Sequence, residues 1–228
     1  MKKIVAFLLL ACMMFSLAAC GDSGAEYKLG MGVVLSTDSS KENNAQVDAT
    51  VATVVTDANG KIVLCRIDCA QSKMDVTGGA VDTAKTFQTK MELGDDYGMV
   101  AYGNAIAEWD AQAKAFESYV VGKTAAEVQA IETTTNDHGY TVAADETLYA
   151  SCTMGISDFI DAVVKACNDE KGSSFTGKDF TLGVAAVTEA GDSTPAADGN
   201  DAQVKMYSHF GAAVVDKDGK ILAALTDA

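Results

Sequence analysis

The chain has 228 residues, a formal net charge of -15, 48% hydrophobic residues and a single proline. This composition is typical of a folded domain and argues against a disordered chain. The negative charge argues against nucleic acid as a partner and against electrostatic docking on anionic lipid headgroups.

The first 20 residues have the pattern of an export signal. Two lysines precede an apolar run that is too short for a comfortable membrane-spanning helix, and the run ends in the sequence LAAC at Cys20. This ending resembles the lipobox of bacterial lipoproteins, whose cysteine is acylated and becomes the new N-terminus. An ordinary secretory signal with an incidental cysteine is the alternative. We expect residues 1–20 to be a lipoprotein signal peptide, residues 21–26 a tether, and lipid on Cys20 to hold the protein at the outer face of the cytoplasmic membrane.

Two stretches with a shared pattern organise the remainder. In residues 27–69 and 180–226, an aromatic-x-Leu-Gly strand and a polar loop lead to an Ala-Gln-Val strand, a tight turn and a further strand. The first turn carries Asn59-Gly60 at its tip, and both residue types accept the positive φ that a hairpin turn needs. The pattern predicts two related β units.

Residues 104–170, between the two units, are predicted to be mainly helical. The apolar residues of the first helix recur at spacings of three and four; they are Ile106, Trp109, Ala113, Phe116 and Val120. This periodicity places Trp109 and Phe116 in the core, and flavin stacking by the two rings is the alternative.

Local signals predict the other elements. Thr124 and Glu127 form a capping box that opens a second helix, and Ser157 is expected to cap a third. Residues 148–156 are expected to form a strand or an extended segment, and residues 86–91 one more strand. The result is an α+β domain over residues 27–228, with antiparallel sheets in two related copies and three helices between them.

Four cysteines follow Cys20. Cys65 and Cys69 lie on one predicted strand about 13 Å apart, too far to bridge each other. Buried free thiols are our first interpretation, and a bridge from either residue to Cys152 or Cys167 is the alternative. With only two histidines, no recognisable ligand spacing predicts a metal site.

The stretch from residue 151 to residue 166 resembles the flavin-attachment junction of FMN-binding domains. When Thr153 is set on the family's threonine, Asp161-Ala162-Val163 and Lys165-Ala166 align without a gap with the helix that follows it. Residues 57–62 and 89–99 also resemble flavinylated lipoproteins of Gram-positive bacteria that pass electrons outside the cell. Two departures stand out: Ser151 and Cys152 replace Gly-Ala, and Thr147 replaces an aspartate.

The resemblance implies a mechanism in which a separate transferase esterifies the FMN phosphate to the hydroxyl of Thr153. A helix that begins near Ser157 would then place N–H groups close to the phosphate. We expect a lipid-anchored, FMN-binding-like protein that is not an enzyme and that binds a small ligand or a redox partner as an accessory module. The alternatives are an extracellular electron-transfer flavoprotein with FMN on Thr153, and a structural surface module.

Overall fold

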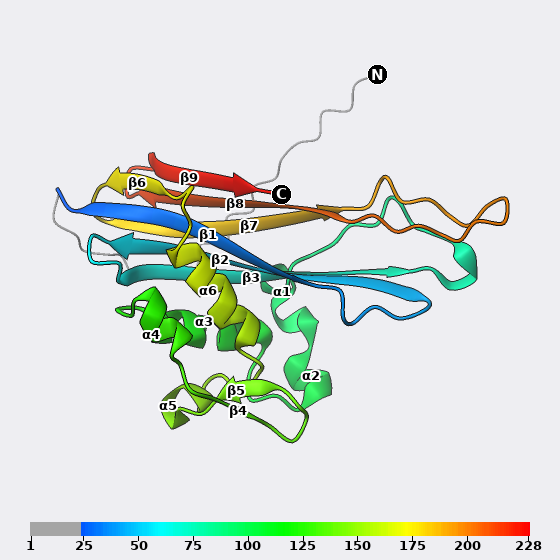
Figure 1. Ribbon diagram of the computed structural model, residues 1–228, viewed down its shortest axis with the longest axis horizontal. Helices are drawn as coiled ribbons and strands as arrows, with labels where there is room; N and C mark the ends of the chain where they lie inside the picture. Colours follow the sequence, from blue (N-terminus) through cyan, green and yellow to red (C-terminus); the bar gives the residue numbers. More distant parts are fainter. Residues whose placement is uncertain (1–23) are drawn as a thin grey trace.

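The computed structural model describes residues 24–228 (Figure 1). The expected signal peptide, Cys20 and the first part of the expected tether lie outside the described residues. The described part of the chain is an α+β protein with antiparallel sheets, which confirms the predicted class.

The strands are β1 (Glu26–Ser36), β2 (Asn44–Asp57), β3 (Ile62–Asp75), β4 (Thr133–Thr135), β5 (Thr141–Ala143), β6 (Ser173–Thr176), β7 (Phe180–Glu189), β8 (Tyr207–Asp216) and β9 (Ile221–Asp227). The α-helices are α1 (Lys90–Leu93), α2 (Met99–Gly103), α3 (Trp109–Val120), α4 (Ala125–Gln129), α5 (Glu146–Tyr149) and α6 (Ser157–Cys167). Two short 3-10 helices are η1 (Thr77–Gly79) and η2 (Gly94–Tyr97).

The strands form two large sheets and one small hairpin. One sheet has four strands in the order β3-β2-β1-β6, and the other has three in the order β7-β8-β9. All neighbouring strands are antiparallel. The two stretches with the shared sequence pattern therefore form two three-stranded units, β1–β3 and β7–β9, which lie in separate sheets.

The second turn of each unit has the same hydrogen bonds. Oδ1 of Asp57 accepts from the backbone N–H groups of Asn59 and Lys61, each at 2.9 Å, and Asp216 accepts in the same way from residues 218 and 220. Gly60 takes a φ of 74°, whereas Asn59 does not have a positive φ. The expectation of positive φ at Asn59 is wrong, because this turn ends in a single left-handed glycine and the β2–β3 register shifts beside it.

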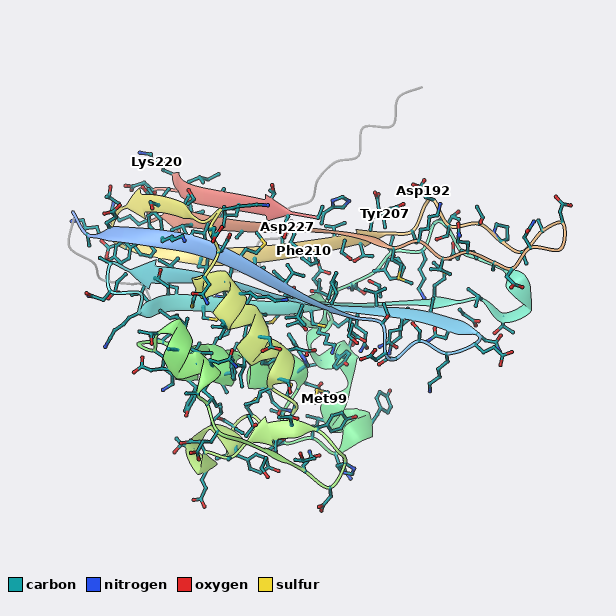
Figure 2. The ribbon with its side chains drawn as sticks, viewed as in Figure 1. Met99, Asp192, Tyr207, Phe210, Lys220 and Asp227 are labelled. Atoms are coloured by element: carbon teal, nitrogen blue, oxygen red, sulfur yellow. The ribbon has the colours of Figure 1, made fainter. Side chains whose placement is uncertain are left out.

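The two sheets pack face to face, and Figure 1 shows the helices as a third layer on the other side of the four-stranded sheet. The space between the sheets is filled by apolar side chains of both, including Leu29, Val51, Val55, Phe180 and Phe210. Phe210 is labelled in Figure 2, in the layer between the sheets. This arrangement is an aligned sandwich, in which the strands alternate inward and outward side chains.

The other face of the four-stranded sheet is covered by α3 and α6. Ala52 and Val54 of β2 point to this side and contact the helices, whereas Val51 and Val55 point into the sandwich. Strand β2 is therefore buried on both faces, as its apolar sequence suggests.

Two glycines of β1 let α6 approach the sheet closely. A Cβ atom on Gly30 would collide with the carbonyl oxygen of Ala166, and one on Gly32 with that of Ala162. Gly183 is the equivalent of Gly30 in the second unit, and a Cβ there would meet no atom within 4 Å. The outer face of the three-stranded sheet has no such helix among the described residues.

Residues 104–170 contain helices α3 to α6 and also the β4–β5 hairpin, and several expectations for them hold. Trp109 and Phe116 are buried in the core, 4% and 0% exposed. Thr124 and Glu127 form the predicted capping box at the start of α4. Ile106 is 56% exposed and precedes α3, so its expected place in the apolar stripe is wrong.

Other expectations for local structure are wrong. Residues 86–91 contain the start of α1, capped by Thr89, and no strand. Residues 148–156 begin at the end of α5, which Asp145 caps, and continue as an irregular loop. Ser157 is the first residue of α6 and not its cap; Ile156 holds the cap position without a side-chain hydrogen bond. The described chain has six α-helices where three were expected, because the additional helices have only four or five residues.

Candidate functional site

Thr153 lies in the loop that leads from α5 into α6. Its side chain is half-buried, while Cys152 before it and Ile156 after it are fully buried. The buried flanking residues fix the loop to the core and leave the threonine at the surface of the helical layer. The residue expected to carry a cofactor thus lies four positions before the first residue of α6.

Gln112 of α3 holds this loop in place. Its Oε1 atom accepts hydrogen bonds from the backbone N–H of Thr153 at 2.9 Å and of Met154 at 3.2 Å. Its Nε2 atom donates to the carbonyl of Ala107 at 2.8 Å, and the side chain is completely buried. The hydroxyl of Thr153 is 3.4 Å from the same Oε1, a long hydrogen bond that engages it weakly. The loop is therefore rigidly held while its hydroxyl remains available.

The first turn of α6 contributes N–H groups that lack helical partners. The first hydrogen bond of this helix runs from the N–H of Ile160 to the carbonyl of Ile156, so the N–H groups of residues 157–159 precede it. Such groups, together with the helix dipole, favour a negatively charged ligand.

Lys90 of α1 lies against two aromatic rings near this site. Its Nζ atom is 5.1 Å from the ring centroid of Tyr97 and 5.6 Å from that of Trp109. The position of α1 is fixed by Asp68, whose carboxylate accepts from the N–H of Met91 at 3.2 Å. Lys90 thus brings a positive charge to the N-terminal end of α3, which begins at Trp109.

Carboxylates gather on the same side. Partial burial raises the pKa of Asp158, in the first turn of α6, and the charges of Asp161 and Asp48 raise it further, while Lys90 opposes them. Asp48 of β2 accepts from Nε2 of Gln46 at 2.7 Å and from Nε2 of Gln71 at 2.8 Å. The start of α6 therefore carries both signs of charge.

Two side chains considered as site residues belong to the interior. Trp109 packs edge to face against Phe159, with ring centroids 5.6 Å apart, which supports a core role over flavin stacking. Cys152 stands where the flavin-attachment motif that this loop resembles has alanine, and burial raises the pKa of its thiol to about 11. Cys65, Cys69 and Cys152 are buried, and all four cysteines of the described residues are free. A buried thiol with a raised pKa, such as that of Cys152, is unreactive at neutral pH.

Gln112 and Lys90 were not identified as site residues from the sequence. A signal for Gln112 existed: it follows Trp109 by three positions and precedes Phe116 by four, so it lies on the apolar face of α3. A polar residue at such a position is buried only when it has partners. No sequence signal pairs Lys90 with Trp109, because their contact depends on how α1 and α3 pack.

Two features are absent from residues 24–228. No helix in this range is both long enough and apolar enough to cross a membrane. Within the same range, no three side chains of His, Cys, Asp or Glu are grouped so as to hold a metal ion.

Comparison with known proteins gives one relationship. The chain is 34% identical over 137 residues to a chlorophenol reductase of Desulfitobacterium hafniense, and the match covers 53% of this chain and 42% of that protein. The chain therefore spans less than half the length of the curated relative that it matches, and the two are distantly related. No family model matches the chain. No solved structure matches it either.

Proposed function

We propose that the chain is a lipid-anchored cell-surface protein of the FMN-binding type that carries a flavin nucleotide on Thr153 and takes part in electron transfer. The observation that carries the proposal is the position of Thr153. The residue is half-buried, its backbone N–H donates to Oε1 of Gln112, and its hydroxyl makes only a 3.4 Å contact with the same atom. The distant relationship to a protein named as a reductase supports a redox role.

In this proposal each residue has a separate task. The transferase would use a flavin dinucleotide as the activated donor: the Thr153 hydroxyl oxygen would attack the phosphate next to the flavin, the bond from that phosphate to AMP would break, and the hydroxyl proton would pass to a base of the transferase. Gln112 would keep the loop fixed while this ester forms. The N–H groups in the first turn of α6 and the charge of Lys90 would attract the phosphate. When bound, the isoalloxazine ring supplies the electron transfer, and the protein sets its position and electrostatic surroundings.

A second candidate function is a binding or accessory module without flavin. The carboxylates of Asp48 and Asp158 favour it, because negative charge near the start of α6 opposes a phosphate. The departures at Ser151, Cys152 and Thr147 also favour it, since a transferase that reads the local motif would meet a changed one.

The visible spectrum and the intact mass of the mature protein, produced in a host that has the flavin transferase, separate the two candidates. The flavoprotein is yellow and heavier by one esterified FMN, with the modification on the peptide that contains Thr153. Thr153→Val removes the hydroxyl with little change of shape and should abolish the added mass. Thr133→Val, at an exposed position of β4, is the matched control and should retain it. A colourless wild-type protein at its bare mass would reject the flavin proposal and leave the accessory module.

The proposed location depends on Cys20. Cys20→Ser removes the acylation site, so the variant protein should leave the membrane fraction in a detergent partition experiment. Continued membrane association of the variant would contradict lipid anchoring at this residue.

A further inference from the structure

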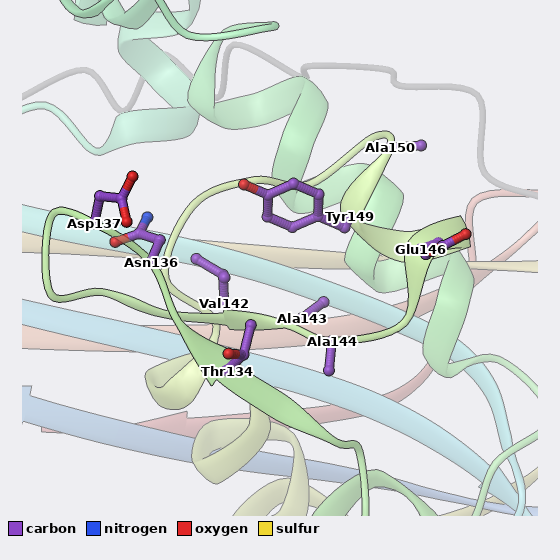
Figure 3. A pocket seen from close by; sticks show the side chains of 9 residues that line it. All are labelled: Thr134, Asn136, Asp137, Val142, Ala143, Ala144, Glu146, Tyr149 and Ala150. Atoms are coloured by element: carbon purple, nitrogen blue, oxygen red, sulfur yellow. The ribbon is translucent and has the colours of Figure 1, made fainter.

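A second candidate site lies between the β4–β5 hairpin and α5, and Thr153 is not among the residues that line it. An open cavity of about 550 Å³ is present there, lined by residues of both elements (Figure 3). Its volume is within the range of small-molecule sites, roughly 300 to 1,000 Å³. Nothing in the proposed role of Thr153 uses this cavity.

One part of the cavity is an apolar surface with an exposed aromatic ring. Val142 and Ala143 of β5 are almost fully buried, at 1% and 2% exposed, and form part of its lining. Tyr149 at the end of α5 remains 41% exposed. In Figure 3 its ring extends toward the side of the hairpin that carries Asn136 and Asp137. An exposed ring that lines the same cavity as buried apolar side chains can stack against a flat, partly apolar ligand.

The polar part of the cavity has an oriented donor. Oδ1 of Asn136 accepts from the backbone N–H groups of His138 at 3.0 Å and Tyr140 at 2.9 Å, which fixes the orientation of the amide. Its Nδ2 group has no acceptor among residues 24–228 and remains free to donate. The carboxylate of Asp137 and the hydroxyl of Thr134, which also line the cavity, supply acceptors. Glu146 points away from these groups (Figure 3).

We propose that this cavity binds a small neutral polyhydroxylated ring, the chemistry of a mono- or disaccharide. Each sugar hydroxyl both donates and accepts, so it matches an amide donor beside a carboxylate acceptor, and the C–H face of the ring stacks on a tyrosine. The carboxylate of Asp137 and the acidity of the chain oppose an anion. An amine would leave the free amide group of Asn136 facing a cation, donor against donor.

Saturation-transfer NMR on the mature protein tests the proposal, with glucose, galactose, N-acetylglucosamine and maltose as probes. At least one of these sugars should receive saturation from the protein. Tyr149→Ala should weaken its binding tenfold or more because the stacking surface is lost. Asn136→Asp should weaken it similarly: the aspartate keeps both turn hydrogen bonds and replaces the free donor with a negatively charged acceptor. Tyr102→Ala is the matched control, since Tyr102 is 92% exposed and does not line the cavity.

Two results would overturn the proposal. The first is the absence of saturation transfer to all four sugars at millimolar concentration. The second is binding that Asn136→Asp and Tyr149→Ala leave unchanged, because the sugar would then sit elsewhere. The thermal midpoint of each variant shows whether it is folded. If Tyr149→Ala does not fold, sugar binding by Asn136→Asp alone tests the proposal.

Discussion

Gln112 combines complete burial with three hydrogen bonds to backbone groups. Gln112→Met keeps the size of the side chain but leaves the N–H groups of Thr153 and Met154 and the carbonyl of Ala107 without this partner. Each buried polar group left unpaired costs about 1–3 kcal/mol, and the loop is only partly buried. We expect a loss of about 2–4 kcal/mol in the free energy of unfolding, measured by urea denaturation.

Gln129→Met provides the control at the residue scale. Gln129 is exposed at the end of α4, so the same chemical change should shift the free energy of unfolding by less than about 0.5 kcal/mol. An equally small effect at Gln112 would show that water or a shifted loop replaces its hydrogen bonds.

At the scale of elements, the two units contain a matched pair of glycines. Gly30→Ala places a methyl group against the backbone of α6 at Ala166, so the helix has to move, and overpacking of this kind costs about 1–3 kcal/mol or more. Gly183→Ala, at the same position of the second unit, meets nothing within 4 Å and should cause no loss of stability. Equal thermal midpoints for the two variants would contradict the close contact between α6 and β1.

We expect the contact between α3 and the edge of β3 to be sensitive to pH. Glu117 of α3 accepts from the N–H of Ile67 at 2.7 Å and pairs with Arg66 at 3.1 Å. Burial raises the pKa of Glu117 from its usual 4.5 to about 7, and Arg66 only partly opposes this shift. Between these two values the folded chain holds a proton that the unfolded chain releases, so stability falls as pH rises through this window.

We expect the wild-type protein to lose about 1–3 kcal/mol between pH 4.5 and pH 7 relative to Glu117→Gln, which does not titrate. The measurement is the difference in urea-unfolding free energy between the two proteins at each pH. Glu132→Gln, at an exposed position, is the control and should leave the pH profile unchanged. A constant difference between wild type and Glu117→Gln would show that the native carboxyl group titrates normally.

Sequence patterns predicted long elements and failed on short ones. The periodicity of α3 runs over several turns, and the capping box of α4 is a local signal, so both were predictable. Helices α1 and α5 have four residues each, too few to show a period, and two residues of each (90–91 and 148–149) were expected to be extended. The position of Thr153 before a helix was predictable from a motif, whereas its contact with Gln112 joins residues 41 positions apart.

At the scale of the whole molecule, β2 links the two cores. It contributes Ala52 and Val54 to the helix side and Val51 and Val55 to the sandwich, so neither core can be lost while the other stays intact. We therefore predict a single cooperative unfolding transition for residues 24–228. The chain has one tryptophan, Trp109, which lies in the helix-side core and reports on that side by fluorescence.

The test compares Trp109 fluorescence with far-UV circular dichroism, which reports on both sheets, in one urea titration. Phe180→Ala removes a fully buried ring from the sandwich and should cost about 3–5 kcal/mol. Phe180 belongs to the core between the sheets, whereas Trp109 lies in the helix-side core. Because the two cores are linked, Phe180→Ala should lower the urea midpoint measured by Trp109 fluorescence as much as the midpoint measured by circular dichroism. Separate midpoints, or fluorescence unaffected by Phe180→Ala, would mean that the helix layer and the three-stranded sheet unfold independently.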